Sequence, residues 1–134
     1  MFKGLNYKPL LFYLFILSVV ACTNMYKEKD LYGIWVGKNE EVEIVLKFNK
    51  DSKCELMYNN SGSNIIRITG DFEVDFSKKP IPLTIRRIPQ LNHPLHTIIE
   101  FKEMNVIKMA KFATRWRLRP IAFNRDVEII FKRK

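Results

Sequence analysis

The chain has 134 residues, of which 47% are hydrophobic and 28% are charged, and its formal net charge at pH 7 is +9. This length suits one domain, and this composition excludes a disordered or collagen-like chain. Two cysteines and two histidines do not supply a zinc site of the multi-cysteine kind, and the five scattered glycines form no phosphate-binding loop of the Walker type.

The first residues have the pattern of an export signal. Lys3 and Lys8 give a positively charged start, and residues 10–21 form an uncharged, mostly apolar run of 12 residues. A helix needs about 20 residues to cross a bilayer, so this run is short for an anchor and suits the apolar part of a signal peptide. The run ends in the sequence Val-Val-Ala-Cys at residues 19–22.

This ending resembles the lipobox of bacterial lipoproteins, in which the signal peptide is cut before a cysteine whose thiol is diacylated. The resemblance implies cleavage after Ala21 and a lipid on Cys22 that anchors the protein to a membrane. Two or three acyl chains anchor stably, because each buried CH₂ contributes about 0.8 kcal/mol. Thr23 stands where an aspartate would retain an enteric lipoprotein at the inner membrane, which favours the outer membrane in a Gram-negative organism. The alternative is an ordinary secretory signal, or a short anchor helix, with an incidental cysteine.

The resemblance divides the chain into three parts: a signal peptide over residues 1–21, the lipidated Cys22 with a polar tether up to residue 30, and one domain over residues 31–134. With Cys22 carrying lipid, Cys54 is the only free thiol, which excludes an intramolecular disulfide. Cys54 lies on the inward face of an alternating segment, so we predict a buried thiol without a redox role. The stability of the domain must then come from its hydrophobic core.

From Leu31 onward, apolar and polar residues alternate, as in strands that bury one face and expose the other. The alternation is clearest over residues 42–48, 53–58, 66–76 and 127–132. Turn-forming residues such as Asn59-Asn60-Ser61-Gly62 separate these segments. Strands that recur about every ten residues, without sustained helical periodicity, predict an all-β barrel or sandwich.

Gly33-Ile34-Trp35 resembles the Gly-x-Trp start of the lipocalins and of small bacterial lipocalin-like domains. In that family the glycine permits a sharp entry into the first strand and the tryptophan plugs the closed end of the barrel. A basic residue at the end of the last strand covers the tryptophan by cation–π stacking. The resemblance assigns that role to Arg133, with Lys132 as the alternative.

The middle of the chain is similar to short lipocalin-like domains of environmental bacteria. The similarity lies in the order of Gly70-Asp71-Phe72, Lys78-Lys79-Pro80 and Arg119-Pro120. It implies a small antiparallel, lipocalin-like (calycin-type) barrel of about eight strands. Such a barrel either holds one small ligand or fills its interior with side chains. The candidate ligand-binding residues are Trp35, Leu46, Tyr58, Phe72, Phe101 and Met109, and Ile44, Ile85 and Ile129 share their inward face.

The polar residues do not form a recognisable catalytic or metal site. His93 and His96 lie three residues apart in a loop without a third ligand, so we predict no metal site. Asp71, Glu73 and Asp75 alternate along one segment and indicate a solvated outer face rather than a catalytic pair. No serine or cysteine stands in a nucleophile elbow. We therefore predict a protein that is not an enzyme and needs no cofactor.

The positive charge is concentrated at the carboxyl end. Residues 22–103 contain 12 basic and 12 acidic residues, whereas residues 104–134 contain 9 basic and 2 acidic residues. Arg115, Arg117 and Arg119 alternate with apolar residues, so a strand here would carry three guanidinium groups on one face. Such a face would bind a membrane surface or an anionic envelope component; the alternative is that it serves solubility and protects an edge strand. Nucleic acid fits the charge but not an exported address.

Together these features predict an exported, lipid-anchored and non-catalytic protein of the cell envelope. The leading hypothesis is that the barrel binds a small apolar or amphipathic ligand. The alternative is an interaction module with a filled barrel, which docks an anionic partner or membrane through its basic face. A third hypothesis is an inhibitor of an envelope-directed enzyme such as lysozyme, ranked last because most lysozymes are basic and would be repelled. The sequence specifies neither the ligand nor the oligomeric state.

Overall fold

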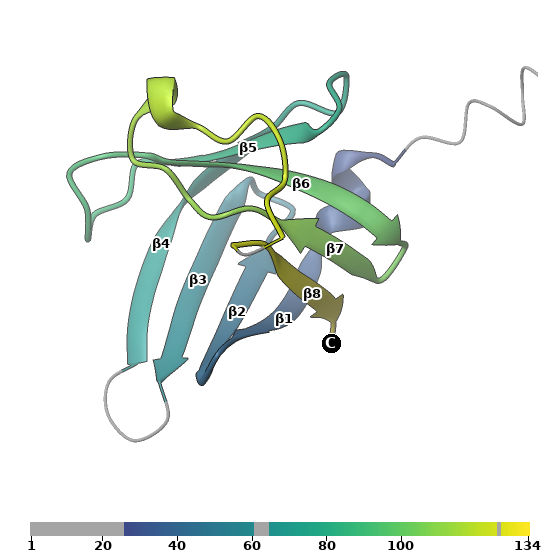
Figure 1. Cartoon of the computed structure of the whole chain (residues 1–134). Coiled ribbons are helices and arrows are strands. Elements are labelled where there is room, and N and C mark those ends of the chain that lie inside the picture. The colour runs from purple at the N-terminus through teal and green to yellow at the C-terminus, as the bar shows by residue number, and fades with distance from the viewer. Residues whose placement is uncertain (1–25, 61–64, 126) are drawn as a thin grey trace, which may run out of the picture.

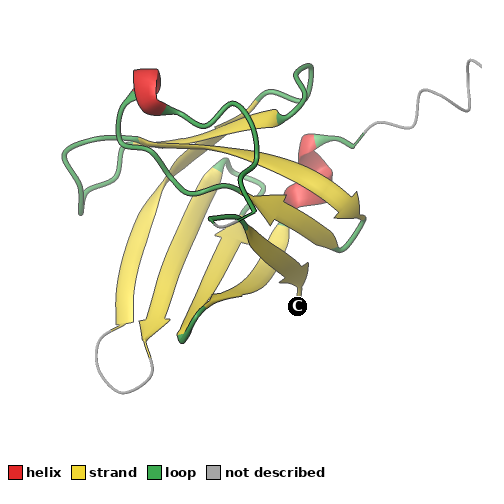
Figure 2. Cartoon of the chain, in the orientation of Figure 1, coloured by secondary structure: helices red, strands yellow, loops and turns green. Residues whose placement is uncertain are grey.

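The computed structural model describes residues 26–60, 65–125 and 127–134, which form a closed antiparallel barrel (Figure 1). Each strand pairs with the next along the chain, and the first pairs with the last. The strands are β1 (Gly33–Asn39), β2 (Val42–Phe48), β3 (Lys53–Asn60), β4 (Ile65–Val74), β5 (Ile81–Arg86), β6 (Leu95–Glu103), β7 (Val106–Met109) and β8 (Ile129–Arg133). Among the described residues the only helices are two 3-10 turns, η1 (Glu28–Leu31) and η2 (Trp116–Leu118) (Figure 2). The prediction of an eight-stranded, all-β barrel is confirmed. The predicted signal peptide and Cys22 lie outside the described residues.

The alternation in the sequence becomes the inner and outer faces of the barrel. In β2, Ile44 and Leu46 are buried while the intervening residues are more exposed. Leu46 pairs in register with Leu56 of β3, which pairs with Ile68 of β4. Because residues opposite each other in a sheet share a face, this row of aliphatic side chains points into the barrel.

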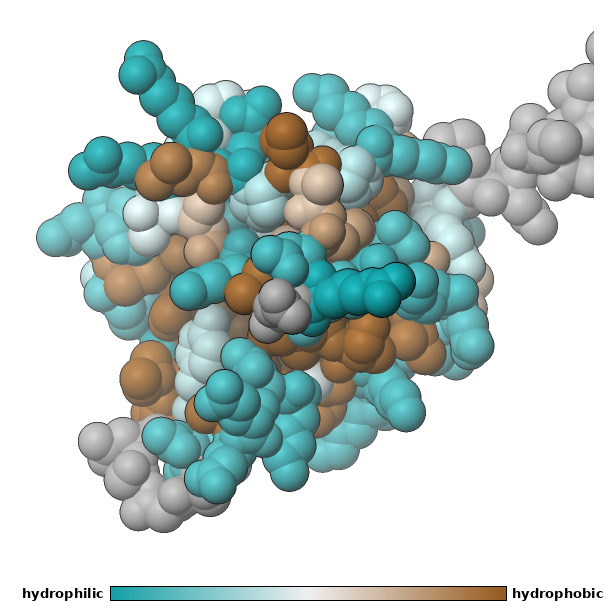
Figure 3. All heavy atoms as spheres, viewed as in Figure 1, coloured by the Kyte–Doolittle hydropathy of each residue, from teal (hydrophilic) through white to brown (hydrophobic). Residues whose placement is uncertain are grey.

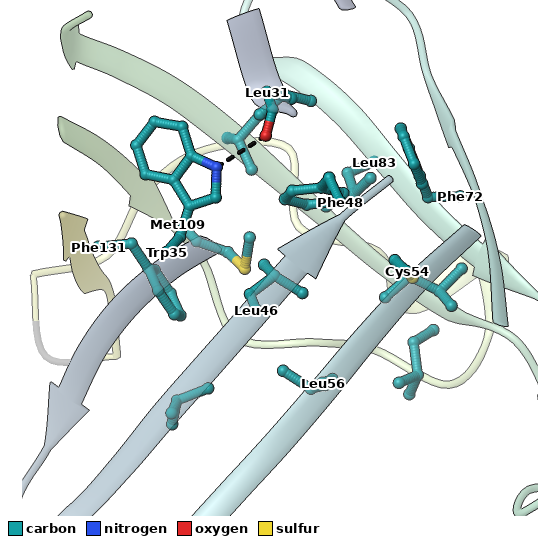
Figure 4. Close-up of a cluster of buried hydrophobic side chains, with 14 of the residues drawn as sticks. Leu31, Trp35, Leu46, Phe48, Cys54, Leu56, Phe72, Leu83, Met109 and Phe131 are labelled. Carbon is teal, nitrogen blue, oxygen red and sulfur yellow. Dashed lines mark hydrogen bonds between the residues drawn. The ribbon is translucent and has the colours of Figure 1, made fainter. Parts of the chain in front are cut away.

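Large side chains fill much of the interior (Figure 4). Phe48 and Phe72 meet edge to face, with ring centroids 4.8 Å apart. Burial of each large apolar side chain contributes about 1.5–3 kcal/mol to stability. Cys54 lies in this core with 3% of its surface exposed, and burial raises the pKa of its thiol to about 12. The prediction of a buried Cys54 is confirmed. The side chains that are almost fully buried are Leu31, Trp35, Leu46, Phe48, Leu56, Leu83, Ile85, Ile99, Ile107, Met109 and Phe131.

Trp35 plugs one end of the barrel, called here the closed end. Its Nε1 donates a hydrogen bond of 2.8 Å to the carbonyl oxygen of Leu31 (Figure 4). The Cζ atom of Arg133 lies 4.2 Å from the centroid of the Trp35 ring, the arrangement that the resemblance to lipocalins implies. Gly33 has a φ of +124°, and a Cβ atom on it would lie 3.1 Å from the Arg133 guanidinium. Glycine is therefore required where the chain enters β1 beneath this arginine.

The segment before β1 packs on the barrel. The Tyr26 ring stacks on Phe101 of β6, with centroids 4.1 Å apart. Arg133 donates hydrogen bonds to the carbonyl oxygens of Asp30 and Tyr32. Residues 26–30, the last part of the predicted tether, thus contact the domain directly.

The connection between β7 and β8 departs from the sequence-based prediction. The alternation of Arg115, Arg117 and Arg119 would place three guanidinium groups on one face if the segment were a strand, but Trp116–Leu118 form η2 and the flanking residues are loop. The condition is not met, because β7 and β8 pair directly with each other and leave the connection outside the ring of strands. The connection instead crosses the outer face of β5 and β6, where the Trp116 ring meets His96 edge to face at a centroid distance of 5.3 Å (Figure 1).

Candidate functional site

A pocket of about 420 Å³ lies at the end of the barrel opposite Trp35, called here the open-end pocket. Its floor consists of the buried side chains of Ile44, Met109 and Phe131. Its walls include Tyr58, Phe112 and Ile129, and its polar rim includes Asn39, Glu40 and Lys111. An apolar floor with a few polar groups at its edge is the usual composition of a small-molecule site.

A glycine shapes the floor. Gly37 of β1 pairs in register with Phe131 of β8. A Cβ atom on Gly37 would lie 2.9 Å from Cδ1 of Phe131 and 3.0 Å from the carbonyl oxygen of Ile130. Since real Cβ atoms seldom approach other atoms this closely, glycine allows the Phe131 ring to lie against β1.

One wall of the open-end pocket is fixed by a buried hydroxyl. Thr97 points from β6 into the barrel and donates a hydrogen bond of 2.7 Å to the carbonyl oxygen of Ala110. Two backbone hydrogen bonds of 2.8 Å then join His96 to Ala113. These bonds hold the chain after β7 against β6 and position the intervening Phe112 in the wall.

Tyr58 gives the open-end pocket a partly buried polar group. Tyr58 pairs in register with Ile44 of β2, so both side chains face the interior. Burial raises the pKa of the Tyr58 phenol above its usual value near 10. The hydroxyl is therefore protonated at neutral pH and is suited to donate a hydrogen bond rather than to act as a base.

The six predicted ligand-binding residues separate into three groups. Tyr58 and Met109 line the open-end pocket. Trp35, Leu46 and Phe72 are buried in the filled part of the barrel and do not line the open-end pocket. Phe101 lines a different hollow of about 350 Å³, near the closed end. Sequence reasoning missed Phe112 and Lys111, because they follow β7 in a loop and only the bonds to β6 bring them to the pocket.

The predicted anion-binding residues do not form a row. Arg119 folds back on Trp116: its Cζ lies 3.8 Å from the ring centroid, and its Nη1 donates a hydrogen bond of 3.0 Å to the Trp116 carbonyl. Arg115 and Arg117 are exposed on either side of Trp116. The face of three parallel guanidinium groups is therefore absent, although the charge itself remains at the surface.

The two histidines occupy different environments. His96 is buried, its Nδ1 lies 3.0 Å from the Thr84 hydroxyl, and burial together with the charges of Arg86 and Arg119 lowers its pKa. His93 is exposed in the loop between β5 and β6. No group of three potential metal ligands occurs among the residues that the structure describes.

The acidic residues of β4 form ion pairs on the outer face, as expected for a solvated surface. Asp71 lies 2.7 Å from Lys53 and 2.7 Å from Arg87. The hydrogen bond from Lys53, followed by that from Arg87, lowers the pKa of Asp71. Glu73 pairs with Arg86 at 3.1 Å. These carboxylates are engaged with cations and do not face the open-end pocket.

Within the described part of the chain, no helix is both long enough and apolar enough to cross a bilayer. Comparison with known protein families, with curated proteins and with solved structures finds no match for this chain.

Proposed function

We propose that this protein is a non-catalytic, lipid-anchored protein of the cell envelope that binds a small apolar or amphipathic ligand in the open-end pocket. The observation that carries the proposal is the pocket itself, about 420 Å³ in volume with an apolar floor. Small-molecule sites typically measure about 300–1,000 Å³ and combine apolar walls with a few polar groups. The lipobox-like residues 19–22 support the anchor.

The shape of the pocket favours a short amphipathic ligand. Below the floor of the open-end pocket the interior is occupied by Trp35, Phe48 and other large buried side chains, so a long acyl chain cannot extend from this pocket through the barrel. An apolar or aromatic body would contact Phe131 and Phe112, while a polar head would lie near Glu40 at the rim. In this arrangement the ligand loses apolar surface to the protein and keeps its polar end hydrated.

A fluorescent probe tests the proposal. Ile129 lines the open-end pocket, whereas its neighbour Ile130 is exposed on the outer face of β8. We expect Ile129→Trp to fill the pocket and weaken binding of a dansylated short-chain fatty acid at least about tenfold, the loss of about 1.4 kcal/mol of binding free energy. Ile130→Trp adds the same side chain outside the pocket and should leave the affinity unchanged.

Titration of the probe by dansyl fluorescence, with thermal unfolding of each variant, separates lost binding from lost folding. Equal affinities in both variants, or no saturable binding to the wild-type protein, would contradict the pocket proposal.

A second candidate function is interaction with an anionic partner or membrane through the basic carboxyl-terminal part of the chain. The observation that favours it is the run of residues 110–125, which contains five basic and no acidic residues. Because that segment lies across the outer face of β5 and β6, both functions are compatible with one barrel.

A further inference from the structure

The connection between β7 and β8 combines positive charge with exposed apolar side chains. The exposed fractions are 50% for Trp116, 67% for Leu118 and 75% for Ile121. Residues 115–121, called here the basic loop, also contain three arginines and no acidic residue. Figure 3 shows apolar atoms among hydrophilic ones along the upper edge of the molecule, where this connection runs. Large apolar side chains exposed close together mark a surface that meets a partner.

The basic loop is attached to the barrel on both sides of Trp116. Ahead of it, Ala113 forms two backbone hydrogen bonds of 2.8 Å with His96 of β6. At its centre, the Trp116 ring contacts the His96 ring and carries the Arg119 guanidinium. The exposed side chains of Leu118 and Ile121 are therefore presented by a segment with defined contacts to β6.

The basic loop is continuous with the turn between β4 and β5. A shallow hollow between them is lined by residues that include Lys79, Pro80, Trp116 and Ile121. Lys79 and Pro80 also line the neighbouring hollow that contains Tyr26. One surface thus runs from the basic loop to Tyr26, and we call it the docking face.

The charge of the docking face is predominantly positive. Glu100, the acidic residue that lines the second hollow, pairs with Lys102 at 3.6 Å. Within the described residues, no ion pair involves Lys79 or an arginine of the basic loop. The charges of Lys79, Arg115 and Arg117 are therefore available to an anionic partner.

The covalent chain places the docking face beside the proposed anchor. Tyr26 follows Cys22 by four residues. Four residues span at most about 14 Å even when fully extended. A lipid on Cys22 would therefore keep Tyr26, and the surface that adjoins it, close to the membrane.

We infer that the docking face rests on an anionic phospholipid bilayer next to the lipid anchor; the inference depends on the anchor of the proposed function. Arginine pairs with lipid phosphates through bidentate hydrogen bonds, and clustered cations are attracted to anionic membrane surfaces. Tryptophan and aliphatic side chains beside such cations insert into the interface. β1 and β2 lie across the barrel from β5 and β6. Because the docking face lies over β5 and β6, the β1–β2 side of the open-end pocket would face away from the membrane.

Tryptophan fluorescence tests this orientation, because the chain has two tryptophans and they differ in exposure. Trp35 is fully buried beneath Arg133, so it provides a constant background, whereas Trp116 is half-exposed. The lipidated protein, purified from cells, is reconstituted into vesicles of phosphatidylcholine with or without phosphatidylglycerol. A portion of the phosphatidylcholine is brominated, because bromine quenches tryptophans that lie within the bilayer interface.

We expect Trp116 emission to shift to the blue and to be quenched in the anionic vesicles, and Trp116→Phe to abolish both changes. Arg115→Glu with Arg117→Glu should return the signal to the level seen in neutral vesicles, because neither side chain has a described contact within the barrel. The matched control, Lys38→Glu with Lys47→Glu, makes the same change in net charge on β1 and β2 and should keep the quenching.

Two outcomes would overturn the inference in different ways. A protein that floats with both kinds of vesicle but leaves Trp116 unquenched has an anchor and no docking face. A protein that fails to float with neutral vesicles has no lipid anchor, which would overturn the anchor and the docking together.

Discussion

The guanidinium of Arg133 joins the two ends of the described chain. It covers the Trp35 ring, donates to the carbonyl oxygens of Asp30 and Tyr32, and donates through Nε to Oδ1 of Asn105 at 2.9 Å. A planar group with several N–H donors suits this site, because one face stacks on the ring while the edges form hydrogen bonds. The side chain of Arg133 thus closes the barrel at the Trp35 end.

Replacing Arg133 should destabilise the fold. We expect Arg133→Leu to lower the free energy of unfolding by about 3 kcal/mol, because the cation–π contact and several charge-assisted hydrogen bonds are lost together. Arg133→Lys should recover part of this loss, since it restores the charge but not the planar fork. Urea unfolding measures each value. The exposed neighbour Lys132 provides the control: Lys132→Leu should change stability little, and equal losses at both positions would contradict the role of Arg133.

At the scale of the elements, the connection between β7 and β8 contributes to both the open-end pocket and the docking face. Its first residues form a wall of the open-end pocket, and its middle forms the basic loop. Neither role follows from secondary structure, since most of the connection is loop. Two residues of β6 hold this connection in place: the Thr97 hydroxyl bonds to Ala110, and the His96 backbone bonds to Ala113.

Removing one of these bonds should loosen the connection. Thr97→Val keeps the shape of a buried side chain but leaves the Ala110 carbonyl without its hydroxyl partner, which costs about 1–3 kcal/mol. We expect a lower free energy of unfolding and weaker binding of the dansylated probe, because Phe112 loses its fixed position. Thr69→Val, at a less buried position of β4, is the control and should affect neither quantity strongly. If the Thr97→Val protein is destabilised but binds the probe as tightly as the wild type, the Thr97 hydrogen bond does not shape the open-end pocket.

At the scale of the whole molecule, the anchor, the docking face and the open-end pocket define one proposed arrangement. The lipid would hold the Tyr26 side of the barrel at the membrane, while the β1–β2 side of the pocket remains open to ligands. The two cysteines give this arrangement a direct test, because Cys54 is buried in the core and Cys22 is the proposed lipid site.

We expect Cys22→Ser to leave a precursor that is neither lipidated nor cleaved after Ala21. Radiolabelled palmitate and intact-protein mass spectrometry in the expressing cells measure both properties. Cys54→Ser, which alters the other thiol, should still be lipidated and processed. A Cys22→Ser product that is processed and membrane-bound like the wild type would contradict the lipoprotein assignment.

The sequence by itself indicated an all-β barrel or sandwich, because the alternation of apolar and polar residues over segments such as residues 42–48 and 66–76 is a local property. The closed barrel of about eight strands is what the resemblance to lipocalin-like domains implies, and the structure confirms it. The sequence also indicated Gly33, Trp35 and Arg133 at the closed end, since that resemblance depends on residues at the beginning and end of the domain. Only the tertiary structure decided that Leu46 and Phe72 belong to a filled core while Tyr58 and Met109 line a pocket. The two-residue period of a strand determines which of its side chains point into the barrel. Whether such a side chain borders empty space depends on the side chains that all the other strands contribute to the interior.

The residues between β7 and β8 also show that a local sequence pattern does not by itself determine tertiary structure. Arg115, Arg117 and Arg119 alternate as they would in a strand, yet β7 and β8 pair directly and leave no position for them in the barrel. Trp116 packs on His96 instead, and the local alternation becomes an exposed loop. Local patterns specify which face a strand would bury, whereas the pairing partners that make it a strand are contributed by distant parts of the chain.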